Sequence, residues 1–277
     1  MKIIEYLILG FIQGITEPIP VSSSGHILIF KALLGNVFGN IKIDYEVLAT
    51  LTNFGSFIAI LLFFRKDIIR LIGSFFTFIF NKRKRKDENT KINYKYCWYI
   101  VLGSIPVGIL GLIVEKLDIF DFLEENIKFV GLMLVVTSLF LYLIKDFKGF
   151  KDKADITAKD ALLIGFAQVI ALIPGISRSG ATIVGSMYRG LNRETAFNFS
   201  FMLYLPVSIA TGLLGVLDLM ELNLSVSEII YYLLATFMAF IFTYVATAWF
   251  NKAVKQGKLM YFSIYCLIVG ILVVMFL

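Results

Sequence analysis

Residues 13–26 read QGITEPIPVSSSGH and interrupt an apolar segment with a carboxylate, three consecutive hydroxyls and the only histidine of the chain. A second stretch, PGISRSGAT at residues 174–182, interrupts another apolar segment with serines, a threonine and an arginine. Broken, polar backbone at membrane depth is tolerated only where it is buried in protein or lines a water-filled cavity. In an apolar chain, both stretches therefore indicate a site inside a membrane protein.

The composition supports a membrane assignment. The 277 residues are 58% hydrophobic and 17% charged, and several uncharged runs approach the roughly 20 residues that cross a bilayer core. These runs lack the alternation of barrel strands. We predict an all-α integral membrane protein with six transmembrane helices, in the runs Leu48–Phe64, Tyr96–Val114, Phe129–Ile144, Thr195–Leu217, Ile229–Phe250 and Leu259–Leu277.

The loops between these runs alternate in charge. Lys82–Lys86, Lys145–Lys159 and Lys252–Lys258 are basic, whereas Glu115–Lys128 and Asp218–Glu228 are rich in acids. Because basic loops stay in the cytoplasm, both acidic loops are predicted to face outside. The net charge of +6 thus reflects orientation, and no nucleic-acid partner is expected.

Two interrupted segments, Ile3–Leu34 and Ala161–Arg189, fit this threading only as re-entrant helical hairpins, one from each side. A shift of 155 residues aligns their tips with seven identical pairs in sixteen positions: Gly10/Gly165, Phe11/Phe166, Gln13/Gln168, Ile15/Ile170, Ser22/Ser177, Ser24/Ser179 and Gly25/Gly180. We predict one membrane domain, residues 1–277, built from repeats of roughly 1–150 and 156–277. Three crossings per repeat invert the second copy, so both tips should meet in the interior.

The second tip has the composition of an anion site. Glycine and serine allow backbone N–H groups to converge at a helix start, and the planar fork of Arg178 suits phosphate oxygens. Hydroxyls that could join it are Ser22, Ser23, Ser24, Ser177, Ser179 and Thr182. The alternative is a salt bridge between Arg178 and Glu17 that only locks the two tips together.

The first tip supplies groups for catalysis. Glu17 can act as a base or hold a divalent cation, and His26 can transfer a proton or attack phosphorus. Ser23 is a candidate nucleophile within reach of His26, and attack by His26 or by water is the alternative. One histidine and no cysteine pair exclude zinc or iron by ligand count. Mg²⁺ or Ca²⁺, sharing Glu17 with substrate phosphates, is the expected cofactor if there is one, and no organic cofactor is expected.

Both stretches closely resemble the two signature motifs of the bacterial undecaprenyl-diphosphate phosphatases, the bacitracin-resistance protein family, and the resemblance extends over the whole chain in length and span order. It implies a plasma-membrane enzyme that hydrolyses undecaprenyl diphosphate to undecaprenyl phosphate and inorganic phosphate. This reaction recycles the lipid carrier of peptidoglycan synthesis and confers bacitracin resistance. The implied functional positions are Glu17, Ser23, His26, Ser177, Arg178 and Thr182.

We add further positions to the phosphate-binding set: Gln13, Ser22, Ser24, Ser179 and Gly180. The first motif position of the family can be Glu or Gln, and Gln13 cannot bind a proton or a cation as an acid would. The expected partners are a polyprenyl diphosphate lipid, membrane lipids and a second copy of the chain in a homodimer. The active site is expected to open to the outer face.

Other functions fit the architecture alone. A secondary transporter or flippase for a phosphorylated polyprenyl lipid would use the same inverted repeats, and a channel or an assembly scaffold are weaker alternatives. The combination of a nucleophile, a base and an anion clamp favours the enzyme, and phosphate release separates the two main hypotheses.

Overall fold

The computed structural model describes residues 2–38, 43–117, 123, 126–220 and 224–277. The regular secondary structure of this part of the chain consists of helices and one isolated bridge between Lys151 and Leu191. The helices are α1 (Lys2–Thr16), α2 (Ser23–Phe38), α3 (Tyr45–Phe63), α4 (Arg65–Phe80), α5 (Glu88–Lys116), α7 (Ile127–Ile144), α8 (Ala158–Ile170), α9 (Arg178–Tyr188), α10 (Arg193–Met220), α11 (Val226–Lys255) and α12 (Leu259–Phe276). Two short 3-10 helices, η1 (Lys84–Lys86) and η2 (Lys153–Asp155), lie in loops.

Six helices of the described part are long and apolar enough to cross a membrane: α3, α5, α7, α10, α11 and α12. They coincide with the six predicted runs, which confirms an all-α, multi-pass membrane protein. Their apolar side chains are widely exposed on the surface of the protein, as a lipid environment requires. The two predicted acidic loops fall partly outside the described residues.

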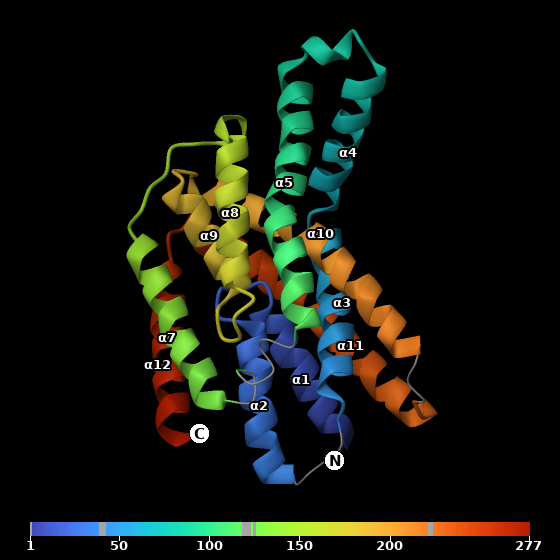
Figure 1. Ribbon diagram of the computed structural model, residues 1–277, viewed down its shortest axis with the longest axis vertical. Helices are drawn as coiled ribbons and strands as arrows, with labels where there is room; N and C mark the ends of the chain where they lie inside the picture. Colours follow the sequence, from blue (N-terminus) through green and yellow to red (C-terminus); the bar gives the residue numbers. More distant parts are fainter. Residues whose placement is uncertain (1, 39–42, 118–122, 124–125, 221–223) are drawn as a thin grey trace.

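The two interrupted segments each form a pair of helices joined by a turn. Figure 1 shows α1 and α2 in one half of the molecule and α8 and α9 in the other, with the two turns close together at mid-height. This arrangement is the one that two opposed re-entrant hairpins would have. The position of a membrane, and hence re-entry itself, stays a prediction.

Helices of the two chain halves pack against each other. α1 lies along α11, α8 lies along α5, and α7 pairs with α12. A Cβ atom at Gly10 would lie 2.3 Å from the carbonyl oxygen of Ala235, and one at Gly165 would lie 2.3 Å from that of Gly103. The two glycines are partners in the predicted repeat, and each allows a helix of the other half to approach its backbone. The interlocked packing is consistent with an inverted repeat, which stays a prediction.

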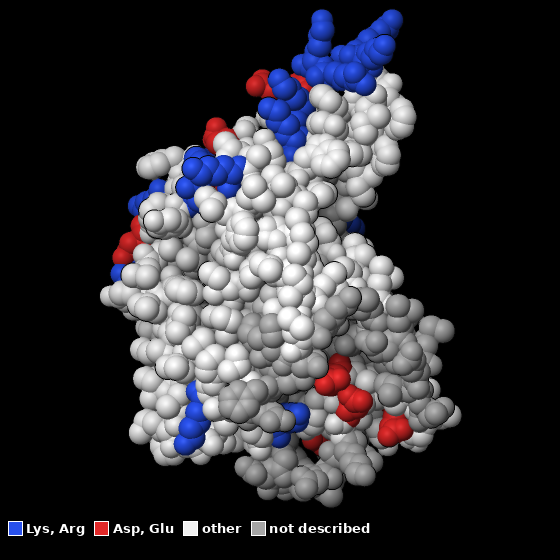
Figure 2. Space-filling view, viewed as in Figure 1, with Lys and Arg blue, Asp and Glu red and all other residues white. Residues whose placement is uncertain are grey.

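Helix α4 was not predicted. It follows α3 directly and packs against the first half of α5, so that the two helices project together beyond the rest of the bundle (Figure 1). Phe78 and Tyr94 stack within this pair, with 4.0 Å between their ring centroids. Figure 2 shows lysine and arginine side chains gathered at the end of this projection, where Lys82–Lys86 lies.

A buried carboxylate organises the start of α8. Asp160 accepts hydrogen bonds from Thr157, from Arg189 at 2.7 Å and from Lys151 at 3.1 Å, and its side chain is inaccessible to solvent. Burial raises the pKa of this carboxyl, but the hydrogen bonds outweigh burial and hold the pKa below its usual value. The ionised carboxylate thus ties α8 to the end of α9 and to the preceding loop, and so fixes the second hairpin.

Candidate active site

The helix that follows each turn is capped by a serine. The hydroxyl of Ser22 accepts a hydrogen bond from the Gly25 N–H at 3.3 Å, and that of Ser177 accepts one from the Gly180 N–H at 3.1 Å. Ser22 and Ser177 are partners in the predicted repeat, so the same local sequence makes the same cap twice. The helices α2 and α9 therefore begin at the meeting point of the turns, with their positive ends directed there.

Ser22 has an unusual backbone conformation, because its φ of 67° lies in the left-handed region. Non-glycine residues in this region cost about 1–3 kcal/mol and cluster at functional sites. The conformation turns the chain sharply into α2, so that Ser23, the first residue of that helix, follows directly after the turn.

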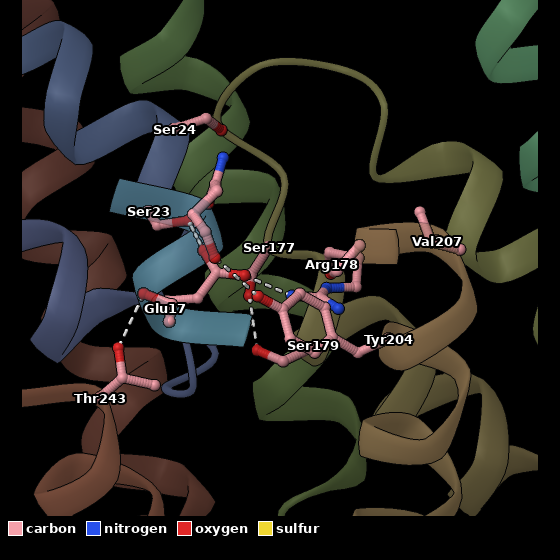
Figure 3. Close-up of polar contacts among 12 residues, drawn as sticks. Glu17, Ser23, Ser24, Ser177, Arg178, Ser179, Tyr204, Val207 and Thr243 are labelled. Atoms are coloured by element: carbon pink, nitrogen blue, oxygen red, sulfur yellow. Dashed lines mark hydrogen bonds and ion pairs between the residues drawn. The ribbon is translucent and has the colours of Figure 1, made fainter. Parts of the chain in front are cut away.

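Glu17 joins the two turns. Its Oε1 accepts a hydrogen bond from Nη2 of Arg178 at 2.5 Å, and its Oε2 accepts one from Ser23 Oγ at 2.5 Å and one from Gln13 Nε2 at 3.0 Å (Figure 3). The residue is only 8% exposed. A single buried carboxylate thus brings together the hydroxyl of one tip and the guanidinium of the other. The salt bridge between Glu17 and Arg178 is the contact that the sequence offered as the alternative to anion binding.

Arg178 lies between this carboxylate and an aromatic ring. Its Cζ is 3.9 Å from the centroid of the Tyr204 ring on α10, which is a cation–π arrangement. The ion pair with Glu17 is the contact that a purely structural role would require. However, the side chain of Arg178 is still 23% exposed, and one contact to Glu17 leaves most of its five N–H donors for another ligand.

Two cavities share Glu17, Ser23 and Arg178 in their walls. The larger one, of about 230 Å³, extends between α3, α5 and α10. The smaller one, of about 50 Å³, lies between the two turns, where Ser22, Ser24, Ser177 and Ser179 also line it. The larger cavity mixes polar residues with apolar ones: Thr50, Asn53, Phe54, Val107, Gln168, Leu172, Tyr204, Val207, Ser208 and Thr211. Such a lining suits a charged group attached to an apolar chain.

His26 does not contact Ser23, contrary to the expectation that it activates this serine. Its Nδ1 lies 2.7 Å from the Ser22 carbonyl oxygen and its Nε2 lies 2.8 Å from the Tyr265 hydroxyl on α12. The ring stacks on Tyr265 and is 3% exposed. Both ring nitrogens are thereby occupied, and Glu17 is the partner of the Ser23 hydroxyl.

Three predicted phosphate-binding residues make contacts that hold the tips in place. Thr182 is fully buried, and its hydroxyl contacts Ser200 on α10 at 2.5 Å. The hydroxyl of Ser179 donates to the Ile19 carbonyl at 3.2 Å, which ties the second turn to the first. The N–H of Gly180 belongs to the cap of α9. Phosphate binding by these three residues stays a prediction.

Sequence reasoning missed three residues that support the site: Asn53, Tyr204 and Tyr265. Asn53 accepts a hydrogen bond from Gln13 at 2.5 Å, and so orients the amide that contacts Glu17. Each is a polar side chain in a predicted transmembrane run, which is the signal that could have drawn attention to it.

The described residues contain no group of three or more His, Cys, Asp or Glu side chains that could hold a metal ion. Glu17 is the carboxylate of the site, and it already accepts from Arg178, Ser23 and Gln13. These residues therefore do not make a resident cation site by themselves. The predicted cation sharing Glu17 with substrate phosphates is not tested by this arrangement.

Comparisons with known proteins agree over nearly the full length. The family model described as bacitracin resistance protein BacA matches residues 6–272. The chain is 41% identical over 275 residues to Undecaprenyl-diphosphatase 2 of Bacillus thuringiensis (strain Al Hakam), covering 99% of this chain and 98% of that protein. It is 42% identical over 277 residues to Undecaprenyl-diphosphatase of Oceanobacillus iheyensis, covering 99% and 97%. Because these matches span both tips and all six spans, the chain belongs to the bacitracin resistance protein BacA family.

Proposed function

We propose that the protein hydrolyses undecaprenyl diphosphate to undecaprenyl phosphate and inorganic phosphate, and so returns the lipid carrier to peptidoglycan synthesis. The observation that carries this proposal is the convergence of Ser23 and Arg178 on Glu17 in the shared wall of the two cavities. Relatives that share about two fifths of the sequence over its whole length are named undecaprenyl-diphosphatases. Bacitracin resistance is part of the family name.

In the proposed reaction, Ser23 is the nucleophile and Glu17 is its base. The serine hydroxyl already donates to Glu17 Oε2 at 2.5 Å, a distance at which a proton can pass to the carboxylate. The serine oxygen attacks the terminal phosphorus, and the bond from this phosphorus to the bridging oxygen breaks. Undecaprenyl phosphate leaves with the electron pair of that bond. Water then hydrolyses the phosphoserine, which releases inorganic phosphate and restores the serine.

Arg178 stabilises the charge that moves during this reaction. The planar guanidinium offers parallel N–H donors to phosphate oxygens, and the ring of Tyr204 below it fixes its plane. Donors that are already in position when charge develops lower the barrier more than flexible ones do. The ion pair with Glu17 holds the guanidinium beside the serine before the substrate arrives.

His26 has a positioning role in this proposal. Its contacts to the Ser22 carbonyl and to Tyr265 tie the start of α2 to α12, which keeps Ser23 at the end of the cavity. Direct attack by His26 would require its ring to leave both partners. Attack by water, with Glu17 as the base, is the second alternative, and it would form no phosphoenzyme.

A divalent cation enters this proposal only with the substrate. Mg²⁺ or Ca²⁺ would share a Glu17 oxygen and complete its shell with phosphate oxygens and water, because both prefer oxygen ligands. Such a cation would neutralise charge on the diphosphate. In the free protein, the positive charge beside the Glu17 carboxylate comes from Arg178.

The larger cavity is proposed to open to the outer face of the plasma membrane. Its wall includes Thr50 and Asn53 in the first half of α3 and Ser208 and Thr211 in the second half of α10. With the basic loops in the cytoplasm, both of these helix halves belong to the outer leaflet. A homodimer is a separate proposal, which the mass of the purified protein in detergent would test.

Phosphate release from undecaprenyl diphosphate by the purified protein tests the proposed function. We expect turnover with the wild type and almost none with Ser23→Ala. The matched control is Ser263→Ala, because Ser263 is a buried serine that pairs with Ser138 on α7 and lines neither cavity of the site. Lipid transport by vesicles that contain the protein, without any phosphate release, would favour the transporter or flippase instead.

A further inference from the structure

Gln168 is a buried residue of the larger cavity that the proposed mechanism has not used. It lies in the last turn of α8 and lines the cavity together with Glu17, Ser23 and Arg178. The residue is 1% exposed. Both polar atoms of its side chain, Oε1 and Nε2, are buried and have no hydrogen-bond partner among the described residues.

An unpaired amide of this kind requires an explanation. Buried polar side-chain atoms in folded proteins are hydrogen bonded in the large majority of cases, because a buried group without a partner loses its hydration and gains nothing in return. An apolar side chain of similar size would avoid this cost. The position therefore carries a polar group whose partner arrives from outside the fold.

The predicted repeat makes the contrast sharper. Gln13 is the counterpart of Gln168 at the shift of 155 residues, and it is also buried. Its amide donates to Glu17 at 3.0 Å and to Asn53 at 2.5 Å. One amide of the pair thus holds the carboxylate in place, whereas the other belongs to a residue that lines the larger cavity and has no hydrogen-bond partner among the described residues.

We propose that Gln168 binds the diphosphate of the substrate. Its Nε2 donates to a phosphate oxygen, and its Oε1 accepts from water that enters the cavity for hydrolysis. A diphosphate carries more oxygens than Arg178 alone can pair, and an amide supplies donors without adding a second buried charge. The inference rests on the proposed function, because it assigns a contact within the same cavity.

The test uses Gln168→Met, since methionine has a similar length and fills irregular space well. Losing one hydrogen bond to a charged group should raise both KM for undecaprenyl diphosphate and Kd for a non-hydrolysable farnesyl methylenediphosphonate on the order of tenfold. The unfolding temperature should stay the same or rise, because the unpaired amide is gone. Gln168→Glu should raise KM and Kd further, since a carboxylate repels the diphosphate.

Asn251→Leu is the matched control. Asn251 on α11 also has a buried oxygen, Oδ1, without a hydrogen-bond partner in the described part of the chain, but it does not line either cavity of the site. Its removal should leave KM, Kd and turnover unchanged.

KM and Kd of Gln168→Met within twofold of the wild-type values would overturn the inference and leave solvent as the partner of the amide. If the wild type binds the analogue but releases no phosphate, hydrolysis is wrong, and the Kd comparison still decides the role of Gln168. If the wild type does not bind the analogue, both proposals are wrong.

Discussion

Replacement of Arg178 by lysine changes the geometry of the site while it keeps the charge. In the wild type, Nη2 of Arg178 donates to Glu17 at 2.5 Å, and its guanidinium lies 3.9 Å above the Tyr204 ring. A lysine ammonium can still pair with Glu17, so the two turns should stay together. It cannot offer parallel donors in a fixed plane to two phosphate oxygens.

The expected loss of kcat in Arg178→Lys follows from the loss of a hydrogen-bond donor that is in place before the reaction. Removing one such donor typically costs about 2.7–4 kcal/mol in the transition state, which is a loss of roughly 10²–10³ in kcat. We therefore expect Arg178→Lys to lower kcat at least about a hundredfold. The stability should change little, because the ion pair remains and the cation–π contact contributes only about 0.5–2 kcal/mol.

Arg189→Lys is the control for this substitution. Arg189 lies at the other end of α9, donates to a single carboxylate, Asp160, at 2.7 Å, and is 30% exposed. Like Arg178, it is a partly exposed arginine in an ion pair with a buried carboxylate, but it lines neither cavity of the site. Phosphate release and the unfolding temperature would be measured for both variants in the same detergent. A kcat for Arg178→Lys within threefold of the wild-type value would refute the clamp and make Arg178 a structural ion-pair residue.

Four further predictions follow from the same structure. A trapped phosphoenzyme should survive acid, as phosphoserine does, and Ser23→Ala should lose more turnover than His26→Ala. The serine route would be contradicted by an acid-labile phosphoenzyme. It would also be contradicted if Ser23→Ala kept a tenth of wild-type turnover while His26→Ala was inactive. Chelator should lower turnover without changing the unfolding temperature, and a chelator-insensitive enzyme would rule out the substrate-borne cation. Wild-type stability should fall as the pH drops through the lowered pKa of Asp160, below its ordinary 3.8, because the paired carboxylate is then protonated. Asp160→Asn should be less stable at neutral pH and should lack this pH-dependent loss of stability. Thermal unfolding measured against pH would show both. In a chain without native cysteines, an impermeant thiol reagent added to whole cells should label Ser227→Cys but not Lys84→Cys, and the reverse pattern would invert the proposed orientation.

The sequence alone was sufficient for the six spans and for the position of the two interrupted segments. A run of uncharged residues long enough to cross a bilayer has few alternatives to a helix, because lipid cannot satisfy a broken backbone. Helix α4 was not predicted from the sequence, because charged residues such as Arg65, Asp67 and Arg70 break its apolar pattern. Its stability depends on ring contacts with α5, and these join residues that are distant in the sequence.

The candidate site was also predicted only in part from the sequence. Glu17, Ser23 and Arg178 could be predicted from the two tips, because charge and hydroxyls in an apolar segment are costly unless they pair or bind a ligand. Only the tertiary structure decided that Glu17, rather than His26, accepts from Ser23, and that His26 turns toward Tyr265. A transmembrane run that is apolar on every side carries no pattern that reveals its inward face. The rotation of α10 and α12 about their own axes, which places Tyr204 under Arg178 and Tyr265 beside His26, therefore follows from packing between helices and not from the local sequence.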